Sequence, residues 1–324
     1  MEHLRRIFLS GGRLISRQSR SSFQPRRVEF TPQLNPNSSS QGNGPRLLRP
    51  FLFTLGFSGS CFTMAAIWEY EDMRSKALEF KQRSYGWVQK KSRDHKLGDF
   101  RNHLNIWWQN ISPADVMFYG ILFANTLVFL AWKIPSMQNF MSAFFCTNPF
   151  ARAVCWPMFF STFSHYSWWH FGVNMFVLHS FTNVAMNSMG KEQFLAFYLS
   201  AGIFSSLGSH VFRTISRTPG LSLGASGAIM GILGYFCSLN PDALLQVAFV
   251  PQFTFTADSG LKALLCFDTF GLLMRWKMFD HAAHLGGVLF GLFWFYFGQQ
   301  NIWKQRIGLL QIWHNFRNGT GPRE

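Results

Sequence analysis

Charged residues are scarce in this chain. Only 14% of its 324 residues are Asp, Glu, Lys or Arg, whereas soluble proteins carry about a quarter. Phe and Trp are common instead, with 38 and 12 copies, and 48% of all residues are hydrophobic. This composition fits a polytopic membrane protein better than an ordinary soluble domain.

Acidic residues are half as common as basic ones, 15 against 30, and the formal net charge is +15. An excess of this size first suggests a nucleic-acid partner. The basic residues do not gather on one folded face, however, because many of them lie in the N-terminal segment and between apolar runs. This distribution favours a role in membrane topology or targeting and argues against nucleic acid.

Cysteine gives no sign of a structural or metal-binding role. The five cysteines lack CxxC spacing, and most lie in or beside apolar runs, where a thiol acts as a small apolar side chain. The pattern predicts neither a disulfide framework nor a zinc site. The cysteines are Cys61, Cys146, Cys155, Cys237 and Cys266.

Residues 1–47 contain no lysine, and their only acids are Glu2 and Glu29. Arg, Ser, Asn and Pro are common in this segment, which lacks the long apolar run of a secretory signal. Arg- and Ser-rich, acid-poor N-termini resemble mitochondrial targeting sequences. We expect residues 1–47 to be such a sequence followed by a disordered linker, with an ordinary basic tail as the alternative.

Long apolar segments follow. Phe51–Trp68 has no charge and is near the minimum length for a span, and the charged, aromatic residues 72–111 predict an interfacial helix. We therefore expect an extra transmembrane helix and an interfacial helix in 48–111. Six further spans are expected at 112–132, 169–189, 192–212, 220–239, 256–274 and 281–298. The sequence predicts an all-α polytopic membrane protein in a 1+6 arrangement, with 299–324 as a C-terminal tail.

Two segments between the predicted spans are expected to be irregular. Residues 136–168 are apolar but contain Pro149 and Pro157, which favours an interfacial loop lying partly in the membrane. Residues 240–255 contain Asn240-Pro241-Asp242 and a Val-Ala-Phe-Val-Pro run typical of strands, and they are expected to form a loop beside the membrane.

One predicted span carries Gly224-Ala225-Ser226-Gly227 near its start. A polar side chain is costly in hydrocarbon, so it usually has a partner and often a function. Serine becomes a good nucleophile when a base takes its proton, and Gly224 and Gly227 allow another backbone to approach closely. The alternative interpretation is a packing seam in which Ser226 is one more small residue.

The last predicted span carries His284, with Gly287 and Gly291 on the same helix face. This face can pack against the Ser226 helix and bring the imidazole within hydrogen-bond reach of the hydroxyl. We predict that Ser226 is a nucleophile and His284 its general base. A histidine that makes only an internal hydrogen bond is the alternative, and a metal site with His281 lacks an evident third ligand.

His170 and Asn174 lie four residues apart and therefore on one face of a third span. An acyl-transfer site needs hydrogen-bond donors where the tetrahedral oxyanion forms, and these two side chains can supply them. The backbone N–H groups of Ala225 and Ser226 can add more. A simple interhelical hydrogen-bond pair is the alternative.

The three motifs His-xxx-Asn, Gly-Ala-Ser-Gly and Ala-His-xx-Gly-xxx-Gly, in this order and each in a span, together resemble the rhomboid intramembrane serine proteases. The resemblance covers residues 112–298 and implies a six-helix protease core that uses a Ser–His dyad. By position it implies Ser226 as nucleophile, His284 as general base, and His170 and Asn174 as oxyanion-binding residues.

The Arg-rich N-terminus, the extra early span and the wording of residues 279–287 are similar to the mitochondrial subfamily of rhomboids. This implies location in the mitochondrial inner membrane, single-span membrane proteins as substrates, the lipid bilayer as surroundings, and no cofactor. A targeting sequence followed by a first span favours an N-terminus in the matrix, whereas the nine basic residues of 72–111 favour the opposite orientation by the positive-inside rule. The alternative is a non-catalytic rhomboid-like protein that binds membrane clients, although such proteins typically lack the serine or the histidine. A transporter is favoured only by the number of spans.

Four further positions bear on the resemblance. Some bacterial rhomboids carry a tyrosine four residues after the nucleophile, where this chain has Met230. His165 matches a histidine common in the family, for which we expect a structural hydrogen-bonding role. Asp280 is either an acid that orients His284 or an interfacial cap, and Asp268, inside a span, has no assigned role.

Overall fold

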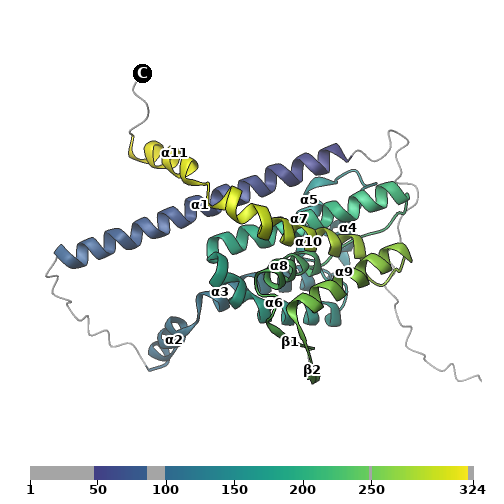
Figure 1. Ribbon diagram of the computed structural model, residues 1–324, viewed down its shortest axis with the longest axis horizontal. Helices are drawn as coiled ribbons and strands as arrows, with labels where there is room; N and C mark the ends of the chain where they lie inside the picture. The colour runs from purple at the N-terminus through teal and green to yellow at the C-terminus, as the bar shows by residue number, and fades with distance from the viewer. Residues whose placement is uncertain (1–46, 86–98, 248–249, 320–324) are drawn as a thin grey trace, which may run out of the picture. The chain divides into compact units, whose positions relative to one another are not determined.

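The computed structural model describes residues 47–85, 99–247 and 250–319. Residues 1–46, which hold the predicted targeting sequence and linker, lie outside the described residues. Apart from one β-hairpin, the regular structure of the described ranges is helical (Figure 1).

The elements follow one another along the chain with these bounds. The helices are α1 (Leu48–Tyr85), α2 (Asp99–Asn110), α3 (Pro113–Ala131), η2 (Pro135–Met137), α4 (Gln138–Phe144), α5 (Cys155–Phe160), η3 (Ser161–Phe163), α6 (Trp168–Met189), α7 (Lys191–Ser216), α8 (Ser226–Leu239), α9 (Ala257–Leu273), α10 (His281–Phe293), the π-helical η4 (Trp294–Trp303) and α11 (Ile307–Asn318). The strands are β1 (Leu244–Val247) and β2 (Val250–Thr256). The predicted fold class, an all-α polytopic membrane protein with one helix before a six-helix core, is confirmed: α1 precedes α3, α6, α7, α8, α9 and α10.

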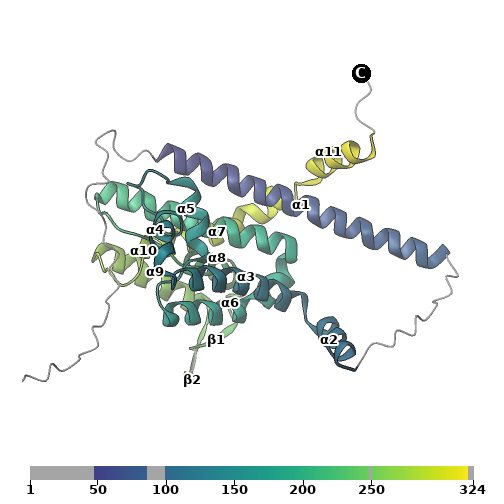
Figure 2. The same ribbon diagram turned by 180° about the vertical axis from the view of Figure 1, so that it is seen from behind.

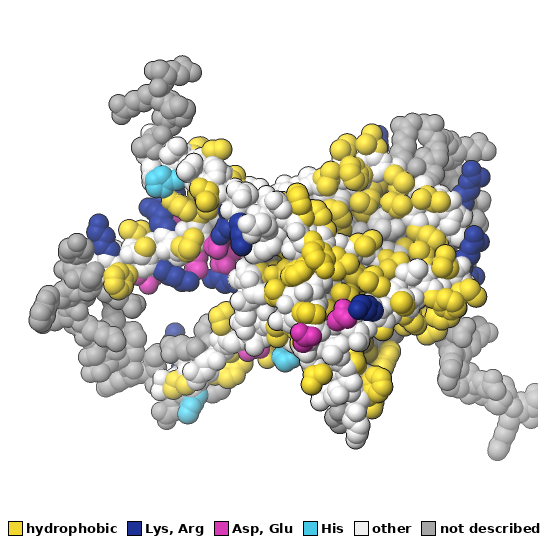
Figure 3. All heavy atoms as spheres, viewed as in Figure 1, with side chains coloured by type: hydrophobic (Ala, Val, Ile, Leu, Met, Phe, Trp, Pro, Cys, Tyr) yellow, Lys and Arg dark blue, Asp and Glu magenta, His cyan; other side chains and the backbone are white. Residues whose placement is uncertain are grey.

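By length and composition, three described helices can cross a membrane, namely Leu48–Gln82 of α1, α3 and α7. The most apolar window of α7 is 67% buried inside the protein, against 28% for those of α1 and α3. α7 is therefore the central helix, whereas α1 and α3 lie at the periphery. In Figure 3, apolar side chains form broad areas on the visible face of the helical core, as expected of a surface that meets lipid.

α1 continues well beyond the predicted end of the first span. We expected a break near Glu69 and a single helix over 72–111, but α1 continues to Tyr85, and α2 is a separate helix. The charged segment of α1 contains strong helix formers and no Gly or Pro, and an ion pair joins Asp72 to Lys76 one turn later, at 2.8 Å. The charges mark the point where α1 leaves apolar surroundings, not the end of the helix.

α1 packs lengthwise against α7 (Figure 2), and it also contacts α5 and α11. The ring of Phe62 stacks on that of Trp294 in η4, with centroids 3.9 Å apart. Beyond its apolar part, α1 forms ion pairs with the C-terminal segment, Glu69 with Arg306 and Glu71 with Arg317, both at 2.6 Å. The predicted tail thus contains a helix, α11, held against α1.

Residues 240–255, predicted to be a loop, contain a β-hairpin. Leu245 pairs with Phe255 across antiparallel strands, and a register shift follows at Gln246 and Val247. Leu245 packs against the apolar cluster of α8, α9 and α10, and Phe255 lies against Gly260 of α9. Val247 pairs with Val250, and the hairpin packs against α9.

Glycines hold α8 and α10 in close contact. A Cβ atom added at Gly287 would clash with the carbonyl oxygen of Gly227, and one added at Gly291 would clash with the carbonyl oxygen of Gly231. The backbones therefore touch, as small residues allow in membrane helices. This seam is the one predicted from the spacing of Gly227, Gly287 and Gly291.

We expect Gly287→Ala to push α8 and α10 apart. Overpacking of a close contact costs about 1–3 kcal/mol, so the unfolding midpoint in detergent should fall and the geometry of nearby side chains should change. Gly120→Ala is the matched control, because a Cβ at this helical glycine of α3 meets nothing within 4 Å. Equal unfolding midpoints for the two variants would show that the seam is not tight.

Candidate active site

Ser226 is the first residue of α8, not part of its interior. The span predicted from residue 220 begins as a helix only at Ser226, because the preceding segment is non-helical and Gly224 has φ +133°. The N–H of Gly224 donates to the carbonyl of Ser161 at 2.9 Å. Ser222 and Thr147 exchange two backbone hydrogen bonds, at 2.8 and 3.0 Å. The segment that leads to Ser226 is thus fixed on two sides.

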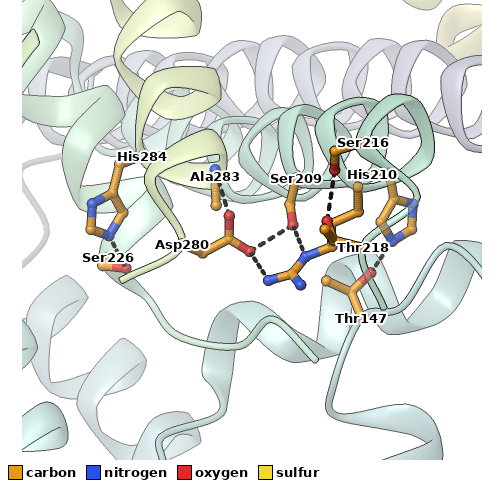
Figure 4. Close-up of polar contacts among 10 residues, drawn as sticks. Thr147, Ser209, His210, Ser216, Thr218, Ser226, Asp280, Ala283 and His284 are labelled. Atoms are coloured by element: carbon orange, nitrogen blue, oxygen red, sulfur yellow. Dashed lines mark hydrogen bonds and ion pairs between the residues drawn. The ribbon is translucent and has the colours of Figure 1, made fainter. Parts of the chain in front are cut away.

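His284 lies in the first turn of α10 and points at Ser226 (Figure 4). Its Nε2 atom is 3.0 Å from the Ser226 Oγ atom. The imidazole is buried, with 9% of the side chain exposed. The glycine seam between α8 and α10 makes this approach possible, since both side chains leave their helices at the end where the backbones touch.

Asp268, for which the sequence suggested no role, lies behind His284. It comes from α9, and its Oδ1 atom is 3.1 Å from the Nδ1 atom of His284. The side chain is 1% exposed. A carboxylate can only accept here, so Nδ1 of His284 carries a proton and Nε2 presents its lone pair to the Ser226 hydroxyl. Serine, histidine and aspartate form one hydrogen-bonded chain.

The carboxylate of Asp280 caps helix α10 and makes no hydrogen bond to the imidazole of His284 within the described residues. Its Oδ1 atom accepts the N–H of Ala283 and caps α10, whereas Oδ2 accepts from Ser209 at 2.6 Å and from Arg213 at 3.0 Å (Figure 4). Burial raises the pKa of this carboxyl, but the Arg213 guanidinium and the hydroxyl donors outweigh that effect and hold it below its usual value. Of the two readings from sequence, the geometry matches the cap.

His170 lies in the first turn of α6 and faces the backbone beside Ser226. The N–H of Tyr166 donates to its Nδ1 atom at 3.4 Å, which places the ring proton on Nε2. A Cβ atom added at Gly224 would lie 2.9 Å from Cε1 of His170 and 3.6 Å from the Ser226 hydroxyl oxygen. The N–H edge of His170 is therefore directed at the region next to the hydroxyl.

Asn174 is buried on the same helix, and its side-chain amide donates to the carbonyl of His170 at 2.7 Å. One amide hydrogen is thus used within α6, and one is left. His165 is buried too, and its ring lies edge-on to that of His170, with centroids 5.0 Å apart. His165 therefore supports the position of His170 by packing.

Met230 stands where some bacterial rhomboids carry a tyrosine, and its surroundings differ from those expected of an aromatic ring beside His284. Met230 packs against the apolar cluster between α8, α9 and α10. The ring of Phe279 lies beside that of His284, with centroids 6.1 Å apart and planes inclined by 38°. Phe279 lies five residues before His284 in the loop ahead of α10, where helical spacing gives no signal.

Within the described ranges, no group of three or more His, Cys, Asp or Glu side chains is placed to hold a metal ion. The five cysteines are unpaired thiols, and Cys146 and Cys237 are buried among apolar side chains.

The fold and the site define a class: a helical membrane protein with the side-chain set of a serine hydrolase at the junction of its packed helices. The chain matches the model of the rhomboid domain over residues 152–301. It also matches mitochondrial rhomboids over most of its length. The chain therefore belongs to the rhomboid family, and within it to the mitochondrial presenilin-associated rhomboid-like proteins.

Three relatives show the extent of this similarity. The human mitochondrial presenilin-associated rhomboid-like protein is 45% identical over 86% of this chain and 73% of its own length. The zebrafish (Danio rerio) presenilin-associated rhomboid-like protein A is 38% identical over 86% of this chain and 77% of its own. Rhomboid protein 1 of Saccharomyces cerevisiae mitochondria is 34% identical over 60% of this chain and 56% of its own. Together they support a protease-type function in a mitochondrial membrane.

Proposed function

We propose that the chain is an intramembrane serine endopeptidase that cleaves single-span membrane proteins in or near their transmembrane helix, with Ser226 as nucleophile and His284 as general base. The 3.0 Å approach of His284 Nε2 to Ser226 Oγ carries this proposal. It lies within the range required for proton transfer between a nucleophile and its base.

The reaction follows from the direction of these hydrogen bonds. Ser226 Oγ attacks the scissile carbonyl while His284 Nε2 takes its proton, and the imidazolium then protonates the leaving amine. Water enters, loses a proton to His284 and resolves the acyl-enzyme. Asp268 accepts from Nδ1 throughout, so it holds the tautomer that the first step needs and stabilises the imidazolium that forms.

The oxyanion of the tetrahedral intermediate needs donors that are already in place. The proposal assigns this role to Nε2–H of His170 and to the second amide hydrogen of Asn174. The start of α8 adds free backbone N–H groups, and the dipole of that helix favours negative charge there. An anionic oxygen beside Ser226 would thus face three sources of positive potential.

The direction in which α1 runs supports an assignment of the side of the membrane on which the active site opens. α1 begins beside α5, where the rings of Phe53 and Trp156 are 5.5 Å apart, and α5 leads to Ser161, whose carbonyl holds Gly224. α1 passes the opposite end of α7, where Lys191 pairs with Asp72 at 3.2 Å, before it continues to Tyr85. We propose that the site opens on the side from which α1 starts, which is the matrix side of the inner membrane if residues 1–47 are a targeting sequence.

The proposal includes the division of the chain. Residues 112–298 are the protease core, 48–111 an N-terminal addition, and 299–324 a tail. The contacts of α1 and α11 with each other and with the core support a structural role for both additions.

A fluorophosphonate probe tests the proposal directly. Such probes phosphonylate a serine that a neighbouring base activates, so the purified protein in bilayer nanodiscs should take up one adduct, on Ser226, as located by peptide mass spectrometry. Cleavage of a single-span reporter should fall in proportion to the labelling. Heat-denatured protein is the control, since unfolding separates Ser226 from His284.

Two results would contradict the proposal. An adduct on another serine, with cleavage lost, would assign the nucleophile elsewhere. Absence of both labelling and cleavage in correctly folded protein would favour a client-binding rhomboid without protease activity.

A further inference from the structure

His281 is a buried histidine that the steps above do not use. It opens α10, three residues before His284, and only 2% of its side chain is exposed. Aromatic rings surround it on the side of the α9–α10 loop, with centroids 5.4 Å away for Phe267 and 6.1 Å for Trp276. Such surroundings would suit an apolar side chain, so a histidine there needs an explanation.

Its polar contact is with Asp268. The Nδ1 atom of His281 lies 2.7 Å from Asp268 Oδ1, the oxygen that His284 Nδ1 approaches at 3.1 Å. One carboxylate oxygen therefore accepts from two imidazoles, and the shorter bond comes from His281. Among the described residues, the second oxygen of Asp268 has no hydrogen-bond partner. The orientation of the carboxylate thus depends on two histidines.

The ring of His281 is held in one place. It lies against Gly271 of α9, where an added Cβ atom would collide with Cδ2, Cε1 and Nε2 of the ring. Its Nε2 atom is buried, and within the described parts of the chain it has no hydrogen-bond partner. A buried polar atom without a partner costs stability, so packing alone does not account for this side chain.

We propose that His281 is a positioning residue for peptide-bond cleavage: its Nδ1–H fixes the carboxylate of Asp268 so that the same oxygen accepts from His284. This inference rests on the proposed function. His281 acts through Asp268, because the Oδ1 atom of that carboxylate accepts from both His281 and His284. The Asp268 carboxylate keeps its orientation through each turnover, when the imidazole of His284 gains and loses a proton.

The proposal predicts a change in kcat and not in KM. Without the bond from His281, the carboxylate rotates about its side-chain torsions, and His284 spends less time in the orientation that accepts the Ser226 proton. Loss of one hydrogen bond to a charged group corresponds to about a tenfold lower kcat. KM for a single-span reporter should stay within about twofold of wild type, because the substrate surface is untouched.

Leucine and asparagine form a matched pair for the test, since they have nearly the same size and shape. His281→Leu removes the donor, whereas His281→Asn keeps an N–H close to the position of Nδ1. We expect about tenfold lower kcat for the Leu variant and recovery to within about threefold of wild type for the Asn variant. A packing role predicts the reverse order, because leucine is the better side chain for an apolar site.

Both variants are measured with their unfolding midpoints and with Ser226→Ala in parallel. Equal kcat for the Leu variant and wild type, or higher kcat for Leu than for Asn, would overturn the inference and leave the proposed function intact. Cleavage by wild type that persists in Ser226→Ala would instead overturn the proposed function, and the inference with it. If the Leu variant does not fold, Gly271→Ala displaces the same ring from the α9 side and should lower kcat similarly, with unchanged kcat counting against the inference.

Discussion

Replacing Ser226 by alanine is expected to reduce cleavage of a single-span reporter by at least about 10⁴-fold, because alanine leaves His284 with no hydroxyl to deprotonate. The residual rate reflects binding and oxyanion stabilisation alone. The protein should remain folded, because the substitution removes only one hydroxyl oxygen from a half-buried side chain at the start of α8. Initial cleavage rates in nanodiscs, with wild type and variant at equal concentration, measure the effect.

Ser238→Ala is the matched control. It lies on the same helix, but its hydroxyl donates to the carbonyl of Gly234 one turn earlier, at the far end of α8 from the site. Its activity should stay within about twofold of wild type. Substantial cleavage by Ser226→Ala, with Ser238→Ala unchanged, would show that Ser226 is not the nucleophile. The hydrogen bond between Ser226 and His284 would then have a structural role only.

The early part of the fold could be predicted because it depends on composition. Uncharged runs such as Phe51–Trp68 mark helices that meet lipid, and Ser112 with Pro113 marks the start of α3, where the serine hydroxyl does accept the N–H of Asp115. The end of α1 could not be found in this way. Charge shows where a chain meets water, whereas the helix ends where backbone hydrogen bonding ends, and no Gly or Pro lies between Glu69 and Tyr85 to interrupt α1.

The pairing of Ser226 with His284 was accessible from sequence for a specific reason. Glycines at spacings of three and four mark the face on which two membrane helices touch, and both polar residues lie beside that face. Asp268 lies sixteen residues before His284 on another helix, and its position depends on how α9 packs against α10. A single acid within an apolar run carries no such marker, so its partners become evident only in three dimensions.

Asparagine at position 268 is expected to lower kcat by about 10³- to 10⁴-fold, the effect of the corresponding change in soluble serine proteases. A carboxylate accepts from His284 Nδ1–H, whereas the amide of asparagine can donate to Nδ1 and stabilise the opposite tautomer. In that tautomer Nε2 carries the proton and cannot take another from Ser226. The nearly unchanged size of the side chain keeps the packing of α9 against α10, so KM and the unfolding midpoint should change little.

Asp258→Asn is the control for this variant. Asp258 is also on α9 but is solvent-accessible and pairs with Lys262 at 2.6 Å, an exposed contact of little energetic weight. The rate of fluorophosphonate labelling at Ser226 should fall in parallel with kcat for Asp268→Asn, because both measure proton removal by His284. If kcat and the labelling rate both fall less than about threefold, His284 keeps its tautomer without a carboxylate. The site would then work as a Ser–His dyad, and Asp268 would only accept from buried N–H groups. A large fall in both would mean that this chain relies on a third residue, which the dyad implied by the rhomboid resemblance does not contain.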